Sequence, residues 1–277
     1  MKVALKGVRG SHPTTGTETS YFGGNTPCVT VVQDGWLLVL DGGSGLQKVA
    51  IPDRSIKRVD ILLTHLHFDH IQGLGFFSPL FDPSMDVHIW APASANGSLH
   101  SRLSRYLSPP LFPVHLRELP CKLTLHDVSN TNFEIGPFTV ESRYVIHPGP
   151  TVGYRIKAHH SVLAYVPDHE PALGPAGILP DKKWISGFDI VKEADLLLHD
   201  AQYTAQEYRT RIGWGHSSID DTIKLASLAG VKQLLLFHHD PSHNDSKLHE
   251  IYSVLLRTKG SLLSFDIARE GMDIELG

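Results

Sequence analysis

Three histidines and one aspartate fall within six residues, and this cluster constrains the fold of the chain more than any other feature. The segment Thr64–His70 reads THLHFDH and directly follows the apolar run Ile61–Leu63. A buried carboxylate beside three imidazoles costs free energy unless a cation compensates its charge. Imidazole nitrogens and carboxylate oxygens suit zinc, manganese or iron. The cluster therefore predicts a metal site in preference to a solvated polar loop.

The spacing of these side chains predicts two metal ions rather than one. His65 and His67 are two residues apart, so in extended backbone at a strand end they point to the same side and can bind one ion together. Asp69 and His70 follow where the strand has turned into a loop and can face a second ion. Two ions about 3.5–4 Å apart form the arrangement used for displacement at phosphorus and hydrolysis at a carbonyl. Four ligands cannot complete two such sites, so others must come from elsewhere in the chain.

The composition limits the class of protein. The 277 residues are 41% hydrophobic and 19% charged, with a formal charge of −4 from 25 basic and 29 acidic residues. This fits one globular domain over residues 1–277 and provides no overall positive field for a long nucleic acid, although a local basic groove is compatible with it. Cys28 and Cys121 are far apart, which predicts neither a disulfide framework nor a Cys-rich zinc site.

The sequence predicts no targeting or membrane segment. Lys2, Lys6 and Gly7 interrupt the first residues before an apolar stretch can form. No apolar run approaches the ~20 residues of a membrane span. We expect a cytoplasmic protein without a membrane partner.

Short apolar runs and helical spacing predict an α/β chain. Strands are expected at residues 2–5, 28–33, 36–40, 58–63, 86–90, 138–146, 152–156, 161–166, 195–200, 233–238 and 262–266. Helices are expected at residues 70–74, 94–107, 219–230 and 244–259. Residues 2–5 are expected at a sheet edge, and Asp34-Gly35 provides the tight turn of a hairpin.

Two segments are expected to lack regular structure. Residues 7–27 are rich in glycine, serine, threonine and proline and are expected to lie near the metal site. Residues 108–114 contain three prolines, which exclude a regular helix. A flap over the metals, a dimer contact and a plain connecting loop all remain open for this second segment.

Polar side chains follow three further apolar strands. His147 follows residues 138–146, Asp168 follows residues 161–166, and His238 ends residues 233–238. Such residues collect at one edge of the sheet, where α/β proteins place their ligands. His147 would complete the first metal site, His238 the second, and Asp168 would bridge them. The expected ligands are His65, His67, Asp69, His70, His147, Asp168 and His238.

Three neighbouring histidines are not expected to bind metal. His169, His239 and His243 flank the expected ligands in the sequence. His239 directly follows His238 and would point to the opposite side of the strand.

The order of these residues resembles the five motifs of the metallo-β-lactamase superfamily, over nearly the whole chain. Asp41, the His65–His70 set, His147, Asp168 and His238 match the motifs in turn. The resemblance implies a four-layer αβ/βα sandwich with two mixed β-sheets and two divalent metal ions at one edge. Zinc is expected, with manganese or iron as alternatives. Asp41 is left open between a hydrogen-bond partner of a ligand and a turn residue.

Within this superfamily the chain is most similar to the ribonuclease Z-like and cyclic-nucleotide phosphodiesterase branch. The similarity lies in His199-Asp200-Ala201 and in Gly215-His216-Ser217-Ser218. In that branch a hydrogen-bonded acid and histidine act at the leaving group. The resemblance implies catalytic roles for His216 and Asp200, together with the ligand Asp69. Asp200 stands where the branch has glutamate, which shortens its reach to His216.

Two departures from family patterns shape the expected partners. Ribonuclease Z enzymes carry a long tRNA-gripping arm between the third motif and the bridging aspartate, whereas here one short hairpin joins His147 to Asp168. With the acidic balance, this argues against a long nucleic acid and favours a small anionic substrate. Neither cysteine lies near a motif, which argues against antibiotic hydrolysis. A homodimer is expected only by analogy.

These features favour a hydrolase acting on small phosphodiesters such as cyclic nucleotides. Bound metal lowers the pKa of water towards ~7. A histidine with an ordinary pKa of ~6.5 can protonate an alkoxide leaving group. Thioester or lactone hydrolysis, RNA endonuclease action and a non-catalytic metal-binding scaffold remain as alternatives.

Overall fold

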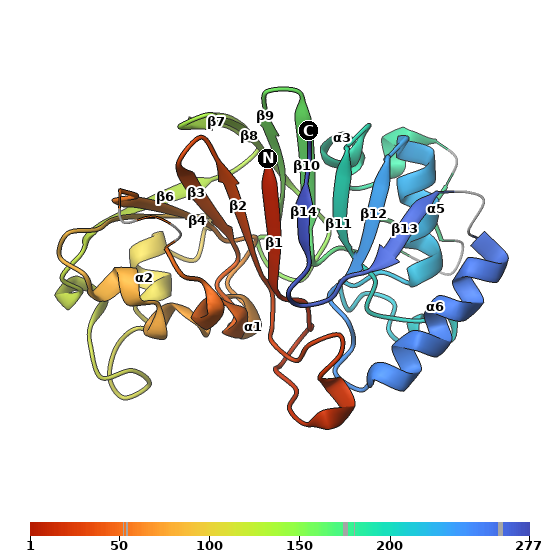
Figure 1. The fold of residues 1–277 in the computed structure, drawn as a ribbon, viewed down its shortest axis with the longest axis horizontal. Helices are drawn as coiled ribbons and strands as arrows, with labels where there is room; N and C mark the ends of the chain where they lie inside the picture. Colours follow the sequence, from red (N-terminus) through yellow and green to blue (C-terminus); the bar gives the residue numbers. More distant parts are fainter. Residues whose placement is uncertain (52, 54, 174–176, 180, 260–262) are drawn as a thin grey trace.

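Two seven-stranded β-sheets face each other across the centre of the molecule (Figure 1). The computed structural model describes residues 1–51, 53, 55–173, 177–179, 181–259 and 263–277. The first sheet has the order β14 (Asp273–Glu275), β1 (Lys2–Gly7), β2 (Cys28–Gln33), β3 (Trp36–Leu40), β4 (Arg58–Leu62), β5 (Asp86–Pro92), β6 (Lys122–Val128). The second has the order β13 (Ser264–Ile267), β12 (Gln233–Phe237), β11 (Leu196–Asp200), β10 (Ser161–Val166), β9 (Val152–Ala158), β8 (Phe138–Tyr144), β7 (Thr131–Ile135).

Both sheets are mixed. In the first, β14, β1, β2 and β3 pair antiparallel, whereas β3 to β6 pair parallel. In the second, β7 to β10 pair antiparallel and β10 to β13 pair parallel. The two mixed sheets and the helices that flank them confirm the expected α/β sandwich.

Helices cover the outer face of each sheet (Figure 1). The α-helices are α1 (Phe68–Ile71), α2 (Leu99–Leu103), α3 (Phe188–Val191), α4 (Ala205–Tyr208), α5 (Ile219–Ala229) and α6 (Asp245–Lys259). Short 3-10 helices are η1 (Thr17–Thr19), η2 (Ser44–Lys48), η3 (Leu74–Phe76), η4 (Ser78–Phe81), η5 (Leu116–Glu118) and η6 (Lys182–Trp184). Helices α1 and α2 lie over the first sheet, and α3, α5 and α6 lie over the second.

The alternation of side chains along each strand builds three apolar layers. In β3, Leu38 and Leu40 point into the core between the sheets, while Leu37 and Val39 pack under the outer helices. Strand β11 divides in the same way, with Leu198 inward and Leu197 outward. A strand covered on both faces must be apolar at successive positions. This explains why these strands read as continuous apolar runs in the sequence.

Several element boundaries differ from those expected. Strand β1 was expected at an edge, but it lies between β14 and β2. The helix expected at residues 94–107 is reduced to Leu99–Leu103, because Gly97 adopts a φ of 119° and Ser98 caps the helix. Helix α1 begins at Phe68, before the expected residue 70. The expected strand 262–266 begins at a position outside the described residues, and β13 spans Ser264–Ile267.

Three strands had not been expected from the sequence: β6, β7 and β14. In the described part of the chain, no helix is both long and apolar enough to cross a bilayer.

Candidate metal centre

The carboxyl ends of the central strands bring the polar residues together. The His65–His70 segment follows β4, Asp168 follows β10, Asp200 ends β11, and His238 follows β12. Strands β10, β11 and β12 run parallel, so their carboxyl ends share one edge of the sheet. Strand β8 runs in the same direction as β10, so the turn after β8 brings His147 to the same edge.

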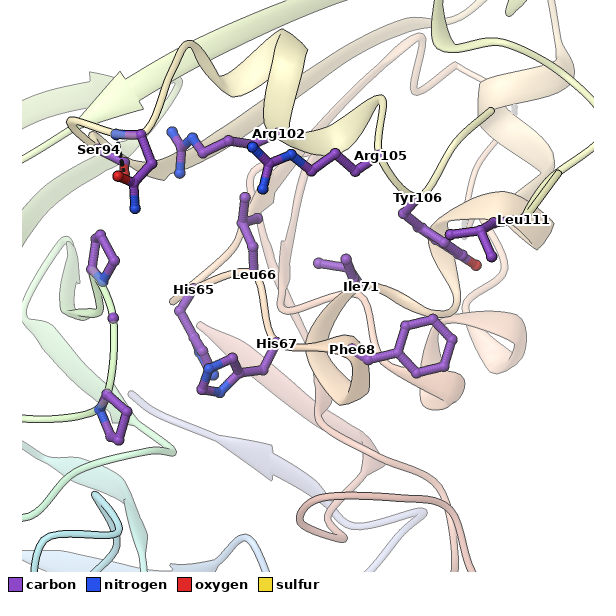
Figure 2. A pocket seen from close by; sticks show the side chains of 14 residues that line it. His65, Leu66, His67, Phe68, Ile71, Ser94, Arg102, Arg105, Tyr106 and Leu111 are labelled. Carbon is purple, nitrogen blue, oxygen red and sulfur yellow. Dashed lines mark hydrogen bonds between the residues drawn. The ribbon is translucent and has the colours of Figure 1, made fainter. Parts of the chain in front are cut away.

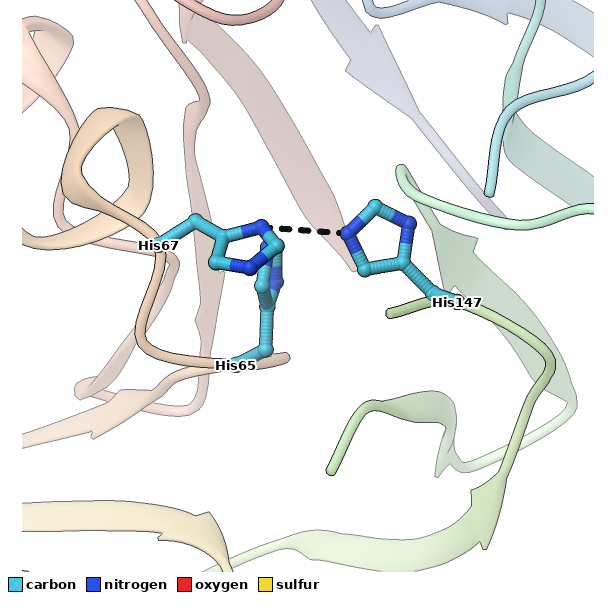
Figure 3. A group of neighbouring side chains, drawn as sticks. All are labelled: His65, His67 and His147. Carbon is cyan, nitrogen blue, oxygen red and sulfur yellow. Dashed lines mark hydrogen bonds between the residues drawn. The ribbon is translucent and has the colours of Figure 1, made fainter. Parts of the chain in front are cut away.

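One group of possible ligands consists of His65, His67 and His147. Their ring nitrogens all lie within 4.8 Å of one another. His67 Nδ1 lies 3.1 Å from His147 Nε2, and Figure 3 shows the two rings facing each other with His65 beside them. His65 and His67 point to the same side, as their spacing predicts.

A second group consists of Asp69, His70 and His238, whose ligand atoms also lie within 4.8 Å of one another. Asp69 Oδ2 lies 3.4 Å from both His70 Nε2 and His238 Nε2. The backbone N–H of Ser11 donates to Asp69 Oδ2 at 2.8 Å. The polar segment 7–27 therefore does reach the site.

Asp168 lies between the two groups. Its Oδ1 is 3.8 Å from both His65 Nε2 and His147 Nε2. Its Oδ2 is 3.0 Å from His70 Nε2 and 3.4 Å from His238 Nε2. One oxygen thus faces each group, which is the geometry that a bridging carboxylate needs.

Partners outside the cluster orient four of the histidine rings. His70 Nδ1 lies 2.9 Å from Asp41 Oδ2, and His147 Nδ1 lies 2.8 Å from the Gly215 carbonyl oxygen. His238 Nδ1 lies 3.0 Å from Gln202 Oε1, and His65 Nδ1 lies 3.1 Å from Thr64 Oγ1. For His147, His238 and His65 this hydrogen bond places the proton on Nδ1 and leaves Nε2 with a free lone pair, whereas the close approach of His70 to Asp41 lacks hydrogen-bond geometry. All four Nε2 atoms point into the cluster as potential ligands.

Asp41 acts as a hydrogen-bond partner rather than only as a turn residue. It is fully buried and accepts bonds from the Thr64 N–H at 2.7 Å and from the Tyr165 hydroxyl at 2.9 Å. Its contact with His70 fixes the ring of an expected ligand.

Buried polar atoms in the centre lack hydrogen bonds, and this tests whether a cation fits. Those that face the centre are His65 Nε2, His70 Nε2, His238 Nε2 and Asp168 Oδ2, and His70 Nδ1 on the far side of its ring also lacks a hydrogen bond. The four atoms that face the centre approach one another without hydrogen-bond geometry. Leaving a buried polar group unpaired costs about 1–3 kcal/mol. Nitrogen and carboxylate ligands of this kind fit a divalent transition metal, which would satisfy all four atoms.

The electrostatics of the cluster also favour a cation. Burial lowers the pKa of His65 well below its usual value and also lowers the pKa of His67 and His147, which keeps these rings neutral. Burial lowers the pKa of His70 too, but the carboxylates of Asp168, Asp69 and Asp41 outweigh it and raise that pKa well above its usual value. Three carboxylates therefore surround His70, and their negative charges stabilise a positive charge at this position. Neutral imidazoles and ionised carboxylates are the forms that bind metal.

His216 and Asp200 form a hydrogen-bonded pair beside the cluster. His216 Nδ1 lies 2.7 Å from Asp200 Oδ2, so the shorter aspartate does reach the ring. Backbone N–H groups of Gln202, Ser217 and His169 donate to the fully buried Asp200. Burial lowers the pKa of His216, but the carboxylates of Asp200, Asp168 and Asp69 outweigh this and raise it to about 9.

Glu170 is a further residue at the site that was not singled out from the sequence. Only 1% of it is exposed, and it accepts hydrogen bonds from the Tyr208 hydroxyl at 2.7 Å, the Gly213 N–H at 2.9 Å and the Gly215 N–H at 2.8 Å. The Gly215 carbonyl in turn orients His147. Glu170 therefore fixes the turn that precedes His216. Through the Gly215 carbonyl, this turn also orients the His147 ring.

The structure brings all seven expected ligands, together with His216 and Asp200, into one continuous cluster. The neighbouring histidines lie outside it. His169 Nδ1 contacts His199 Nε2 at 2.9 Å, His239 Nε2 contacts the Ala268 carbonyl at 2.7 Å, and His243 Nε2 contacts Glu207 at 2.9 Å.

A pocket of about 600 Å³ opens beside His65 and His67 (Figure 2). Its far wall comes from α2 and the residues that follow it, including Arg102, Arg105 and Tyr106. Leu111 also lines it and is 71% exposed, whereas its neighbour Phe112 is buried. The proline-rich segment thus forms part of a pocket wall rather than only a connection.

Comparisons with known proteins agree with this geometry. A family model described as the β-lactamase superfamily domain matches residues 38–239. Ribonuclease Z of Nanoarchaeum equitans is 24% identical over 270 residues, which cover 83% of this chain and 82% of the relative. Ribonuclease Z of Haloarcula marismortui is 25% identical over 277 residues, which cover 86% of each chain.

Solved structures share the fold at low sequence identity. The metallo-β-lactamase fold protein YhfI from Bacillus subtilis has a TM-score of 0.70 at 20% identity and covers 99% of this chain and 98% of its own. A diphosphatase from the PhnP family has a TM-score of 0.70 at 20% identity and covers 100% of this chain and 98% of its own. The short form of human tRNase Z has a TM-score of 0.68 at 20% identity, covering 100% of both chains.

The expectation that argued against a long nucleic acid as partner is wrong. Relatives that match most of the chain are named ribonuclease Z, and a matching structure is a tRNase Z. The formal charge of −4 is summed over the whole sequence and does not describe the pocket. Two arginines and, among the described residues, no acidic one line the pocket beside His65 and His67, so the total charge does not give the charge at the pocket.

Proposed function

The chain belongs to the β-lactamase superfamily, in its ribonuclease Z-like branch, and from this premise we propose that it hydrolyses phosphodiester bonds. It is a metal-dependent hydrolase. The observation that carries the phosphodiester assignment is the Asp200–His216 pair at the edge of the metal cluster.

We propose that the centre binds two divalent cations and that both are zinc. His65, His67 and His147 would hold one, Asp69, His70 and His238 the other, and Asp168 would contact both. Such a pair of cations supplies a water nucleophile at neutral pH and stabilises the charge of an in-line displacement.

The charge balance of the site suits an anionic substrate. Asp69 and Asp168 contribute two negative charges, which is fewer than the positive charges of two divalent ions. The excess attracts a phosphodiester. It also favours release of the proton from His216, but Asp200 opposes this release by stabilising the imidazolium. The cluster thus combines anion binding with a retained proton donor.

His216 is the proposed proton donor to the leaving oxygen. An alkoxide is a poor leaving group and needs a proton or a strong hydrogen bond in the transition state. Asp200 binds Nδ1 and so directs Nε2 away from itself. Tyr203 packs edge to face against the His216 ring, with centroids 5.9 Å apart, and limits its rotation.

Thioester or lactone hydrolysis by the same centre would not need this donor, since thiolates and stabilised leaving groups depart unaided. Among phosphodiesters, the names of the relatives favour RNA as the first substrate class to test. Cyclic nucleotides form the second class.

A substrate panel tests the proposal. Protein loaded with zinc, manganese or iron is assayed on a short RNA, 2′,3′- and 3′,5′-cyclic nucleotides, bis(p-nitrophenyl) phosphate, a thioester and a lactone. We expect turnover of the phosphodiesters. His216→Ala should lower kcat on RNA about 10²–10⁴-fold, the usual contribution of a proton donor, and should affect the p-nitrophenyl ester much less.

The exposed His160, in the turn between β9 and β10, provides the matched control as His160→Ala. Turnover of the thioester or lactone alone would contradict the proposal. So would an equal effect of His216→Ala on alkoxide and p-nitrophenolate leaving groups.

A further inference from the structure

The pocket beside the metal cluster has two arginines in its wall, and one of them has no ion-pair partner among the described residues. Among the residues that the structure describes, its lining contains Arg102 and Arg105 but no aspartate or glutamate. Figure 2 shows both guanidinium groups on the wall formed by α2, with His65 and His67 on the wall formed by the loop after β4. An anion that spans the pocket would meet the metal cluster at one end and this wall at the other.

Arg102 is held in place and keeps part of its donor capacity. Its Nε donates to the Gly97 carbonyl at 3.1 Å, and its Nη2 donates to the Pro92 carbonyl at 2.8 Å and to Asp127 at 2.9 Å. A guanidinium has five N–H donors. Within the described chain the two donors on Nη1 have no acceptor, so they are free for a ligand.

Arg105 is the uncompensated charge of the pair. It follows α2, is exposed, and its side chain makes no hydrogen bond or ion pair with any residue that the structure describes. Asp127 balances Arg102, whereas no acidic residue in the described part of the chain pairs with Arg105. Arginine is suited to phosphate because its planar donors match two phosphate oxygens at once.

An aromatic surface lies next to the arginines. Phe68 lines the same pocket, is 62% exposed, and packs edge to face on Tyr106 with centroids 5.5 Å apart. The Tyr106 hydroxyl donates to the Gln72 carbonyl at 2.6 Å, which fixes the supporting ring. An exposed aromatic face beside a cationic wall is typical of nucleotide binding, because bases stack on such rings.

We propose that Arg102 and Arg105 form a subsite for a second phosphate of a nucleotide substrate, next to the phosphodiester that lies at the metal cluster. This inference rests on the proposed function. A cyclic mononucleotide has only one phosphate and leaves the arginine wall unused. A linear oligonucleotide with a phosphate flanking the scissile bond occupies both ends of the pocket.

Substrates that differ by one phosphate test the subsite. The dinucleotide UpU is compared with pUpU and UpUp at constant ionic strength, for the wild type, Arg105→Gln and Arg105→Lys. We expect the KM of one phosphorylated dinucleotide to be about 10-fold below that of UpU, since a charged hydrogen-bonded contact is gained. In Arg105→Gln the KM ratio between UpU and the phosphorylated dinucleotide should fall towards one, and in Arg105→Lys it should lie between those of Arg105→Gln and the wild type.

Binding without turnover gives a second readout. Titration calorimetry compares uridine 3′,5′-bisphosphate with uridine 3′-monophosphate. Arg105→Gln should weaken binding of the bisphosphate about 10-fold and leave the monophosphate unaffected. Arg257→Gln, an exposed arginine on α6 outside the pocket, is the control for the loss of one positive charge.

The outcomes separate the subsite from the proposed function. If UpU and bis(p-nitrophenyl) phosphate are not hydrolysed with any of the three metals, the proposed function fails, and calorimetry still decides the subsite. If turnover occurs but the added phosphate changes neither KM nor affinity, the subsite is absent. An equal loss in Arg105→Gln and Arg257→Gln would also overturn it, because it would reflect total charge alone.

Discussion

The Asp200–His216 pair shows how neighbouring carboxylates set the protonation state of a proposed catalytic ring. The neighbouring carboxylates raise the pKa of His216 to about 9 despite its burial. A ring with this pKa is protonated at neutral pH, as a proton donor must be. Bound cations would oppose the shift, so about 9 is the upper limit for the working pKa.

The pH profile of kcat follows from this state. On RNA, activity should fall as pH rises through the pKa of His216, at or below about pH 9, because the donor loses its proton. On bis(p-nitrophenyl) phosphate this alkaline limb should be absent, since p-nitrophenolate leaves without a proton.

Measuring kcat from pH 6 to 10 on both substrates checks the assignment. In Asp200→Asn the limb should move to lower pH, because the carboxylate that stabilises the imidazolium is gone. An RNA profile without an alkaline limb, or one unchanged in Asp200→Asn, would remove His216 from the role of proton donor.

At the scale of secondary-structure elements, the turn before α5 connects two parts of the site. Glu170 binds the N–H groups of Gly213 and Gly215, and the Gly215 carbonyl binds His147. Gly215 has a φ of 88°, and a Cβ there would lie 2.5 Å from His147 Nδ1. The turn therefore has one conformation that fits between Glu170 and His147.

Glu170→Gln should disturb this turn, because the amide NH₂ would face backbone N–H donors. We expect a loss of about 10–100-fold in kcat or in metal affinity, the usual effect of losing an outer partner of a ligand. Steady-state kinetics and competition with a chromogenic chelator measure the two effects. Glu134→Gln, an exposed site on β7, is the control. Unchanged kinetics and metal affinity in Glu170→Gln would show that the turn holds its shape alone.

A second contact between elements should make stability depend on pH. Glu207 caps α4 through Thr204 and accepts a bond from His243, before α6, at 2.9 Å. Burial raises the pKa of Glu207, but His243 and Thr204 outweigh it and lower it to about 2 from 4.5. A lowered folded-state pKa gives stability that is complete above about pH 4.5 and is lost as pH falls through about 2.

Glu207→Gln should therefore lower the free energy of unfolding by about 1–2 kcal/mol at pH 7, a value reduced for partial exposure. The difference from the wild type should shrink below about pH 4.5. Urea unfolding at pH 7 and at pH 3.5 measures it, with Glu250→Gln on the exposed face of α6 as the control. A difference that stays constant with pH would show that the ionised carboxylate is not responsible.

The sequence predicted a strand or helix correctly where a single hydrophobic pattern determined the secondary structure. The apolar runs before His65, Asp168 and His238 predicted strands because both of their faces are buried. Strand β6 mixes charged and apolar residues and was missed, since it is only half-buried. The helix expected at 94–107 was too long because Gly97 and Ser98 override the leucine spacing.

The candidate site was predictable to a similar degree. The expected ligands follow strands that end at one sheet edge, so their positions could be inferred from the chain alone. Glu170 and Gln202 could not be inferred, because their partners are backbone groups or rings far away in the sequence. The pocket charge was also missed, because the placement of Arg102 and Arg105 opposite His65 and His67 depends on the fold.

At the scale of the whole molecule, the site lies where loops of the first sheet meet loops of the second sheet. The first sheet contributes the His65–His70 segment and the second contributes His147, Asp168 and His238. The metal centre therefore joins the two halves of the sandwich, and metal binding should stabilise the folded state because the ligands are assembled only there.

The metal content of the protein tests the central claim most directly. Inductively coupled plasma mass spectrometry is applied to wild-type protein and to Asp168→Ala, each equilibrated with zinc and desalted. Two zinc ions per chain are expected in the wild type, and at most one in Asp168→Ala, since Asp168 faces both ligand groups. A wild-type protein that retains no divalent ion, or an Asp168→Ala variant that retains as much as the wild type, would contradict the account.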